Sequence, residues 1–221
     1  VSLCLPQARV SPADFVVSVT VDVMAPSIFS FENLQGSDSS SQLAPSPADY
    51  LVGRAWAERM DWSLAESLGY SPLDICDEVS GAWLNVYKTL RNKKGNGFRR
   101  DLNLVDYVSD MLFVHEMLLH PDIEDRIAVV DAILRGMSGD NSLVLMNYEN
   151  GLPHNLENWE YRDLGFKKIS RSTLLLRDNH FQYPFAEAHL GGREVRFSAS
   201  AEHEEWLLER WQNLVVDYPY R

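Results

Sequence analysis

The chain of 221 residues is long enough for one domain with an appendage and for a substantial hydrophobic core. Its 32 acidic and 20 basic side chains give a formal net charge of −12, which repels phosphates and excludes nucleic-acid binding over a broad surface. The same charge favours a cationic small molecule or a basic protein as the partner.

The cysteines and the hydropathy predict a cytoplasmic protein. Cys4 and Cys76 are too few and too far apart for a disulfide framework, so a reducing compartment is expected. No run of about 18 apolar residues is present, so no membrane span is expected. The first residues also lack the charged, apolar and small-residue order of a signal peptide.

The first strand is predicted at residues 15–24, FVVSVTVDVM, because β-branched residues alternate there. Residues 36–47, GSDSSSQLAPSP, are rich in Ser and Pro and are typical of a linker. A first helix is expected to follow, with Ser46 as its cap, Pro47 in its first turn and Asp49 beside its exposed N–H groups.

The same Ser-Pro-x-Asp arrangement, beginning at Ser71, predicts a second helix. Its apolar side chains follow a helical period at Leu73, Cys76, Val79, Trp83, Val86 and Leu90. Residues 88–100, KTLRNKKGNGFRR, contain Gly95 and Gly97 and predict a loop.

The middle of the chain alternates strands with helices. Residues 107–121, YVSDMLFVHEMLLHP, predict a strand buried on both faces, and a helix is expected from about 122 to 137. Residues 141–148, NSLVLMNY, predict another buried strand. A short helix at 155–166, NLENWEYRDLGF, then precedes a strand at 167–178.

The last predicted element is a helix at residues 201–216 with an apolar stripe. The stripe consists of Trp206, Leu207, Trp211, Leu214 and Val215. This order of elements predicts an α/β (α+β) fold with a mixed sheet. We divide the chain into an N-terminal strand and linker (1–45), a central domain (46–178) and a C-terminal extension (179–221).

Residues 107–178 resemble the second half of the GNAT superfamily of N-acetyltransferases. The segments FVHEMLLHP, DIEDRIAVVDAILRGM, NSLVLMNY and NLENWEYRDLGFKKI follow the family's order over roughly a third of the chain. The resemblance implies a mostly antiparallel central sheet flanked by helices, acetyl-CoA as cofactor and an amine as acceptor. Its most specific part is the set Asn155, Tyr161, Leu164, Gly165 and Phe166.

The resemblance implies catalytic roles for two side chains. Tyr161 matches the family tyrosine that protonates the departing CoA thiolate, and a phenol is suited to that task. Glu116 lies on the strand where family members often place the base that deprotonates the amine. In the family this strand has a bulge, which exposes backbone N–H groups to the oxyanion. The alternative for Tyr161 is a core aromatic that closes its helix.

The resemblance also implies a set of positions that border acetyl-CoA. Asn155 matches an asparagine that contacts the acyl-CoA, and Leu119 belongs to the turn that ends the strand. Arg126, Ala128 and Val130 fall on the pyrophosphate loop, whose family pattern is Arg/Gln-x-x-Gly-x-Gly/Ala.

The pyrophosphate loop departs from that pattern. Small residues let the backbone approach the phosphates, but both glycine positions are replaced in this chain. Asp122, Glu124 and Asp125 also place negative charge where the pyrophosphate would lie. The departure argues against tight binding of acetyl-CoA, but not against the fold.

No metal site is expected. His115 and His120 flank Glu116, but HExxxH has one residue more than the zinc motif HExxH and lies on a strand. We expect a structural or solvent-facing role for each histidine.

The first half of the chain offers little sequence for two antiparallel strands between the second helix and the strand at 107–121. Either the sheet is truncated, or residues 15–34 supply the missing strands.

The resemblance leaves two functions open. A third possibility is that the match is chance and the domain is an unrelated α/β fold. The first is an N-acetyltransferase that acts on a cationic acceptor, with Glu116 as base and Tyr161 as acid. The second is a GNAT-fold protein without catalysis, which serves as a binding or structural module, as in some phage virion proteins. Trp206 and Trp211 would then anchor a second copy or a partner protein, or else seal the C-terminal helix onto the domain.

Overall fold

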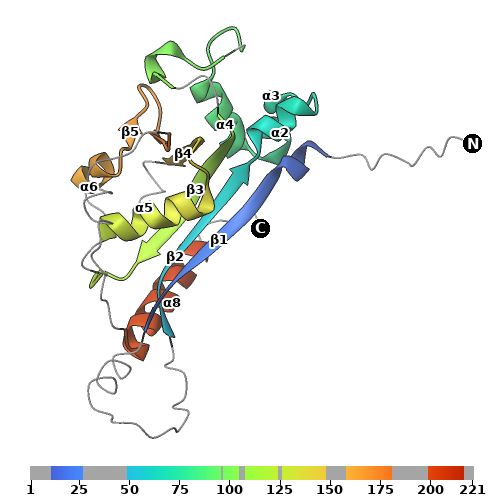
Figure 1. Ribbon diagram of the computed structural model, residues 1–221. Coiled ribbons are helices and arrows are strands. Elements are labelled where there is room, and N and C mark those ends of the chain that lie inside the picture. Colours follow the sequence, from blue (N-terminus) through green and yellow to red (C-terminus); the bar gives the residue numbers. More distant parts are fainter. Residues whose placement is uncertain are drawn as a thin grey trace, which may run out of the picture.

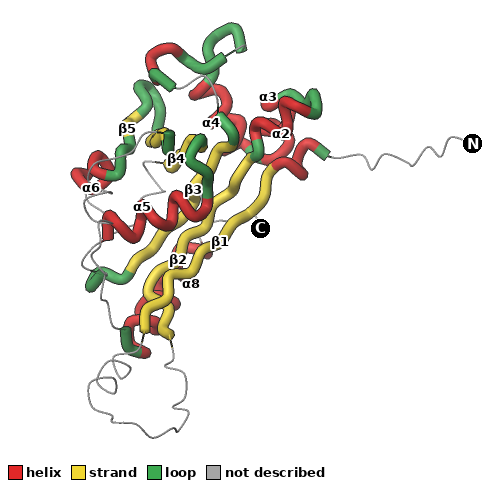
Figure 2. The backbone as a smooth tube through the Cα atoms, viewed as in Figure 1, coloured by secondary structure: helices red, strands yellow, loops and turns green. Residues whose placement is uncertain are grey.

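A mixed sheet forms the centre of the molecule (Figures 1 and 2). The computed structural model describes residues 11–26, 49–95, 97–104, 108–123, 126–147, 158–180 and 199–216. Within these residues the sheet has six strands in the order β1-β2-β3-β4-β6-β5. Neighbouring strands are antiparallel except β3 and β4, which are parallel. The predicted α+β class with a mostly antiparallel sheet is therefore confirmed.

The first two strands form a long antiparallel pair. β1 (Val16–Pro26) follows a short 3-10 turn, η1 (Pro12–Phe15), and confirms the strand predicted at 15–24. β2 (Asp49–Met60) lies where a helix was expected, so that prediction is wrong. β2 is bonded to β1 on one side and to β3 on the other, and alternate side chains along it are buried. This tertiary context outweighs the local helical preference of its Ala, Arg and Glu residues.

Three short helices follow β2 and pack on one face of the sheet: α2 (Trp62–Ser67), α3 (Pro72–Val79) and α4 (Gly81–Leu90). The single helix predicted from Ser71 is broken at Ser80, whose backbone is extended. Ser80 caps α4, because its Oγ accepts a hydrogen bond from the Trp83 backbone N–H at 3.2 Å. The predicted loop follows from Arg91, with a short 3-10 helix η2 (Arg100–Leu102).

The central crossover agrees with the sequence. β3 (Asp110–Leu119), α5 (Arg126–Met137) and β4 (Ser142–Asn147) confirm the predicted strand, helix and strand. β3 and β4 are almost wholly buried, as expected for strands covered on both faces. The missing strands precede the helices in the chain: β2 pairs with β3 on the side away from β4, and β1 pairs with β2.

A helix and then a hairpin follow β4, and the hairpin completes the sheet. α6 (Asn158–Asp163) lies within the predicted helix, and Gly165 leaves it with a φ of +82°, as a helix end requires. The strand predicted at 167–178 is two strands, β5 (Lys167–Lys168) and β6 (Leu174–Asp178). The turn between them contains Arg171 with a φ of +62°.

The helices cover both faces of the sheet. α5 packs on one face with Leu112, Val114 and Val144. The other face carries α2–α4 at one end and α8 (Ala201–Val216) at the other, as Figure 1 shows. α8 confirms the predicted last helix; the side chains of residues 214–216 lie outside the described part. Among the described residues, no helix has the length and apolar character needed to cross a membrane.

Candidate functional site

A bulge interrupts β3 at the place where β3 and β4 stop pairing. The parallel ladder runs from Asp110↔Ser142 to Val114↔Met146, and β3 then continues to Leu119. Across the ladder to β2, Trp56 pairs with Glu116 and Ala57 pairs with Val114. His115 is therefore the extra residue of a β-bulge, next to the candidate base. The resemblance implied a bulge in this strand.

His115 joins an aromatic and acidic cluster that contains Trp56, Glu58, Trp83 and Phe113. Its ring stacks on Trp56, with centroids 4.3 Å apart, and meets Phe113 edge-on at 4.8 Å. Glu58 Oε2 lies 3.0 Å from His115 Nε2 and accepts a hydrogen bond from Trp83 Nε1 at 2.7 Å. These residues come from β2, β3 and α4, so the sheet and a helix build the cluster together.

Glu58 is the ionised group of this cluster. Burial by itself raises the pKa of its carboxyl, but the hydrogen bond and electrostatic interaction with His115 and the hydrogen bond from Trp83 together outweigh burial. The net pKa of Glu58 is lowered. Its side chain is 24% exposed, so the carboxylate is within reach of a ligand.

Glu116 lies beside the cluster and is buried, at 3% exposure. It is opposite Trp56 in the ladder, and opposite residues share a face of the sheet. Glu116 is therefore on the face covered by α2–α4 and α8.

Tyr161 belongs to the core on the other face. It is 4% exposed and is part of the apolar cluster that α5 forms with the sheet. Its ring meets Phe166 edge-on, with centroids 6.1 Å apart. The two predicted catalytic side chains thus belong to opposite faces of the sheet, and Tyr161 has the place of a core aromatic.

The start of α5 contains an internal ion pair. Arg126 Nη2 lies 3.1 Å from Glu160 Oε1 and 3.2 Å from Oε2, and Glu160 on α6 is buried. A carboxylate from the chain itself therefore sits where the resemblance places the cofactor's pyrophosphate. Ala128 and Val130, at the two replaced glycine positions, are buried in the core.

The other predicted cofactor positions add little to this picture. Leu119 is fully buried in the α5 core cluster. Asn155, Glu124 and Asp125 lie outside the described residues.

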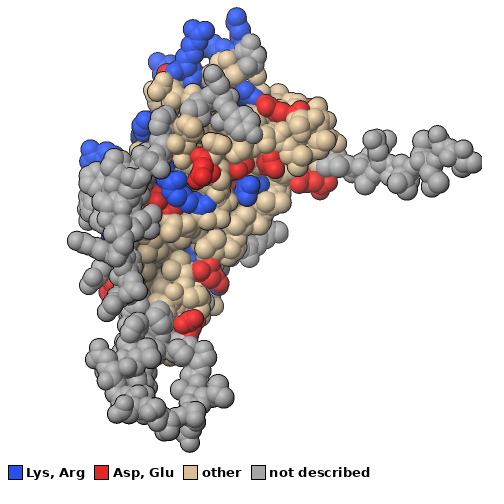
Figure 3. Space-filling model, viewed as in Figure 1, with Lys and Arg blue, Asp and Glu red and all other residues tan. Residues whose placement is uncertain are grey.

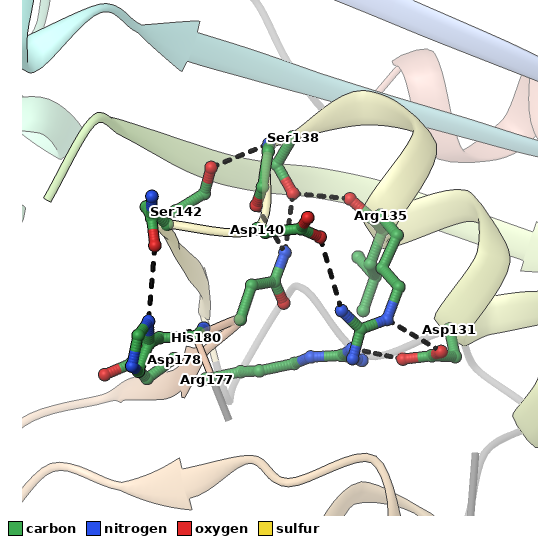
Figure 4. Close-up of polar contacts among 12 residues, drawn as sticks. Asp131, Arg135, Ser138, Asp140, Ser142, Arg177, Asp178 and His180 are labelled. Carbon is green, nitrogen blue, oxygen red and sulfur yellow. Dashed lines mark hydrogen bonds and ion pairs between the residues drawn. The ribbon is translucent and has the colours of Figure 1, made fainter. Parts of the chain in front are cut away.

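A buried polar network at the far end of α5 was missed by the sequence analysis (Figure 4). Asp131 on α5 and Arg177 on β6 are fully buried and form an ion pair. Arg135 Nε donates to Asp131 Oδ2 at 3.1 Å, and Asn179 Nδ2 donates to Ser138 Oγ at 2.8 Å. The available signal was a charged residue in each of two apolar runs, VVDAIL and LLLRD. The network fixes α5 to β6 and has a structural role.

The two tryptophans of α8 pack against the sheet. Trp211 is buried with Leu51, Leu118 and Leu207. Trp206 lies partly buried beside the same cluster. Both side chains therefore help to seal α8 onto β2 and β3.

Comparison of the chain with protein-family models, with curated proteins and with solved structures gave no match.

Proposed function

We propose that this chain is a GNAT-like domain that binds a cationic partner and does not transfer an acyl group. The main support for this proposal is the burial of Tyr161. A proton donor for a thiolate must meet the leaving group, whereas this phenol lies in the core beside Phe166.

The start of α5 supports the same conclusion. A helix N-terminus attracts a phosphate through its exposed N–H groups and its dipole. Here the Glu160 carboxylate lies beside Arg126 at that helix end, and Asp122 precedes it. A pyrophosphate would have to compete with a bound carboxylate for the same arginine.

The acidic and aromatic cluster supports a cationic partner. An ionised carboxylate such as Glu58 binds an ammonium or guanidinium ion well, and the Trp56 ring, one face of which His115 covers, adds an aromatic π-system beside it. Figure 3 shows Lys and Arg gathered over the loop that follows α4, and acidic and basic groups lying among one another over the rest of the visible face. A net charge of −12 would steer a cation towards the protein.

An N-acetyltransferase is the second candidate, and the bulge at His115 favours it. A bulge redirects backbone N–H groups, and here it lies next to Glu116 where β4 ends. Backbone donors at such a position would stabilise an oxyanion, and a nearby carboxylate would deprotonate an amine.

Acetyl-CoA separates the two candidates. Thermal unfolding is measured with and without millimolar acetyl-CoA, since a ligand that binds only the native state raises the midpoint. The binding module predicts no shift and no acetylated spermine, here the polyamine probe. A rise in the midpoint together with acetylated spermine, lost in Tyr161→Phe, would replace the binding module by the enzyme.

Spermine also tests the cationic site directly. Titration calorimetry should show binding that weakens with salt and is reduced in Glu58→Gln. Asp101→Asn is the matched control, because it removes one negative charge from an exposed residue after the α4 loop. Equal loss of binding in both variants would mean that net charge, not the Glu58 cluster, attracts the cation.

A further inference from the structure

A second group of ligand-type side chains lies at the junction between the sheet and α8. His120 follows β3, Asp122 lies in the next turn, and His203 is in the first turn of α8. One ligand atom from each residue lies within 4.8 Å of those from the other two. Asp122 Oδ2 is 3.8 Å from His120 Nδ1 and 3.6 Å from His203 Nε2.

The surrounding structure fixes the two imidazole rings. The backbone N–H of His120 donates to Val52 O at 2.8 Å, which ties this residue to β2. Its ring packs edge-on against Trp206, with centroids 4.7 Å apart, and lies 4.5 Å from the ring of His203. Both rings are therefore held at the contact between β3 and α8 before any ion binds.

Ser200 orients the second ring. The Ser200 backbone N–H donates to His203 Nδ1 at 3.0 Å, and Ser200 Oγ lies 2.7 Å from the same nitrogen. Because Nδ1 accepts, the proton of a neutral ring is on Nε2, which lies on the Asp122 side. An ion on Nε2 would displace that proton, and Ser200 Oγ is the acceptor at hand for an N–H on Nδ1 in the metal-bound tautomer.

We propose that His120, Asp122 and His203 bind a divalent transition-metal ion of the Zn²⁺ class, which clasps the start of α8 to the end of β3. Two imidazole nitrogens and one carboxylate oxygen are a usual zinc ligand set, and Mg²⁺ and Ca²⁺ prefer oxygen ligands alone. Tetrahedral bonds of about 2.0–2.1 Å separate neighbouring ligand atoms by roughly 3.3 Å. The two spacings from Asp122 Oδ2, 3.6 and 3.8 Å, need to contract by a few tenths of an ångström, and the ligand nitrogens of the two histidines lie within 4.8 Å of each other.

The ion would attach α8 to the sheet, and it would take a ligand in addition to these three side chains. His120 Nδ1 now accepts a hydrogen bond from the Asp122 backbone N–H at 3.2 Å, which an ion on Nδ1 would replace. The described residues offer three ligands, so water or a partner's side chain completes the coordination. Among the described side chains, the buried contact of α8 with the sheet consists of Leu207 and Trp211 against Leu51 and Leu118, with Trp206 partly buried beside them. A metal bridge would therefore hold α8 more firmly.

Zn²⁺ added to EDTA-treated protein tests the proposal. We expect saturable binding by calorimetry with one ion per chain, and a higher thermal midpoint, since the ion binds the folded state. Mg²⁺ should give neither effect. His203→Ala should weaken Zn²⁺ binding by about a hundredfold or more, since even outer-shell changes cost about 10–100-fold. His180→Ala, which removes an exposed histidine at the end of β6, should leave binding unchanged.

Co²⁺ provides a second measurement that does not depend on stability. Bound in a four-coordinate site, it gives an intense visible absorption band, which Zn²⁺ should displace and which His120→Ala and His203→Ala should abolish. Equal Zn²⁺ binding in wild type and His203→Ala, or a cobalt spectrum that survives both substitutions, would overturn the site. Absence of Zn²⁺ binding to the wild-type chain would do the same. None of these outcomes depends on acetyl-CoA or spermine.

Discussion

At the scale of single residues, Glu58 has the most informative surroundings. It is a half-buried carboxylate held by the imidazole of His115 and the indole N–H of Trp83. Neither contact was visible in the sequence, because the three residues come from three separate elements. The sequence did identify Glu116, and the resemblance implied a bulge in its strand, but only the ladder shows that His115 is the extra residue.

The stability of the protein should depend on the protonation of Glu58. Its pKa is lowered in the folded state, so the unfolded chain binds the proton more tightly. The stabilisation is complete above the ordinary value of 4.5 and is lost as the pH falls through the lowered folded pKa. Urea unfolding at a series of pH values should show this fall, and Glu58→Gln should make it shallower. An unchanged slope in Glu58→Gln would contradict the assignment.

Tyr161 shows what a residue pattern can predict and what it leaves open. The spacing from Asn155 to Phe166 correctly placed a helix with a glycine exit. It left two interpretations of the phenol, a proton donor or a core aromatic. Burial of the side chain bears on these alternatives, and burial depends on how α5 and the sheet pack on that face.

At the scale of elements, the sequence predicted the second half of the chain better than the first. Local sequence patterns are enough to predict β3, α5, β4 and α8, because each has a long apolar run or a clear helical period. β2 was missed because Ser46, Pro47 and Asp49 were interpreted as a helix start, whereas pairing with β1 and β3, which local sequence does not show, makes the segment a strand. The break at Ser80 was missed because the apolar period continues across it.

Two glycines should respond in opposite ways to the same substitution. A Cβ on Gly53 in β2 would lie 2.4 Å from Leu119 Cδ2 and 3.2 Å from Val23 Cβ. Leu119 is fully buried and cannot move away, so Gly53→Ala should lower the unfolding free energy by about 1–3 kcal/mol.

Gly136 is the matched control, because a Cβ there meets nothing within 4 Å. It is exposed on α5, so Gly136→Ala should raise the unfolding free energy by about 0.5–1 kcal/mol. Urea denaturation of both variants checks the pair. A neutral Gly53→Ala would show that β1, β2 and β3 are less closely packed than described.

The attachment of α5 to β6 depends on the buried ion pair. Replacing Arg177 by Met leaves Asp131 charged in a dry environment, and such changes cost about 3–5 kcal/mol. Arg135→Met removes a half-exposed partner of the same carboxylate and should cost about 1 kcal/mol or less. Chemical denaturation compares the two variants. If the Arg135 variant loses as much as the Arg177 variant, the buried pair is not the main attachment.

At the scale of the whole molecule, net charge acts on stability as well as on partners. Like charges repel in the compact state, and salt screens that repulsion over a Debye length of about 30 Å at 0.01 M and about 8 Å at 0.15 M. The thermal midpoint should therefore rise over this range of NaCl. Exposed pairs such as Arg99–Asp101 contribute little in the other direction. A midpoint that falls with salt would mean that attractive pairs dominate.

The bulge at His115 has a consequence for the sequence of this strand. If His115 is omitted, Val114 and Glu116 become neighbours and still face Ala57 and Trp56, so every remaining pair of the ladder is preserved. A deletion of this one codon in the middle of a buried strand should therefore yield a folded chain with a straight β3. In geometry, β3 is a regular strand with one extra residue, and that residue places a ring on Trp56.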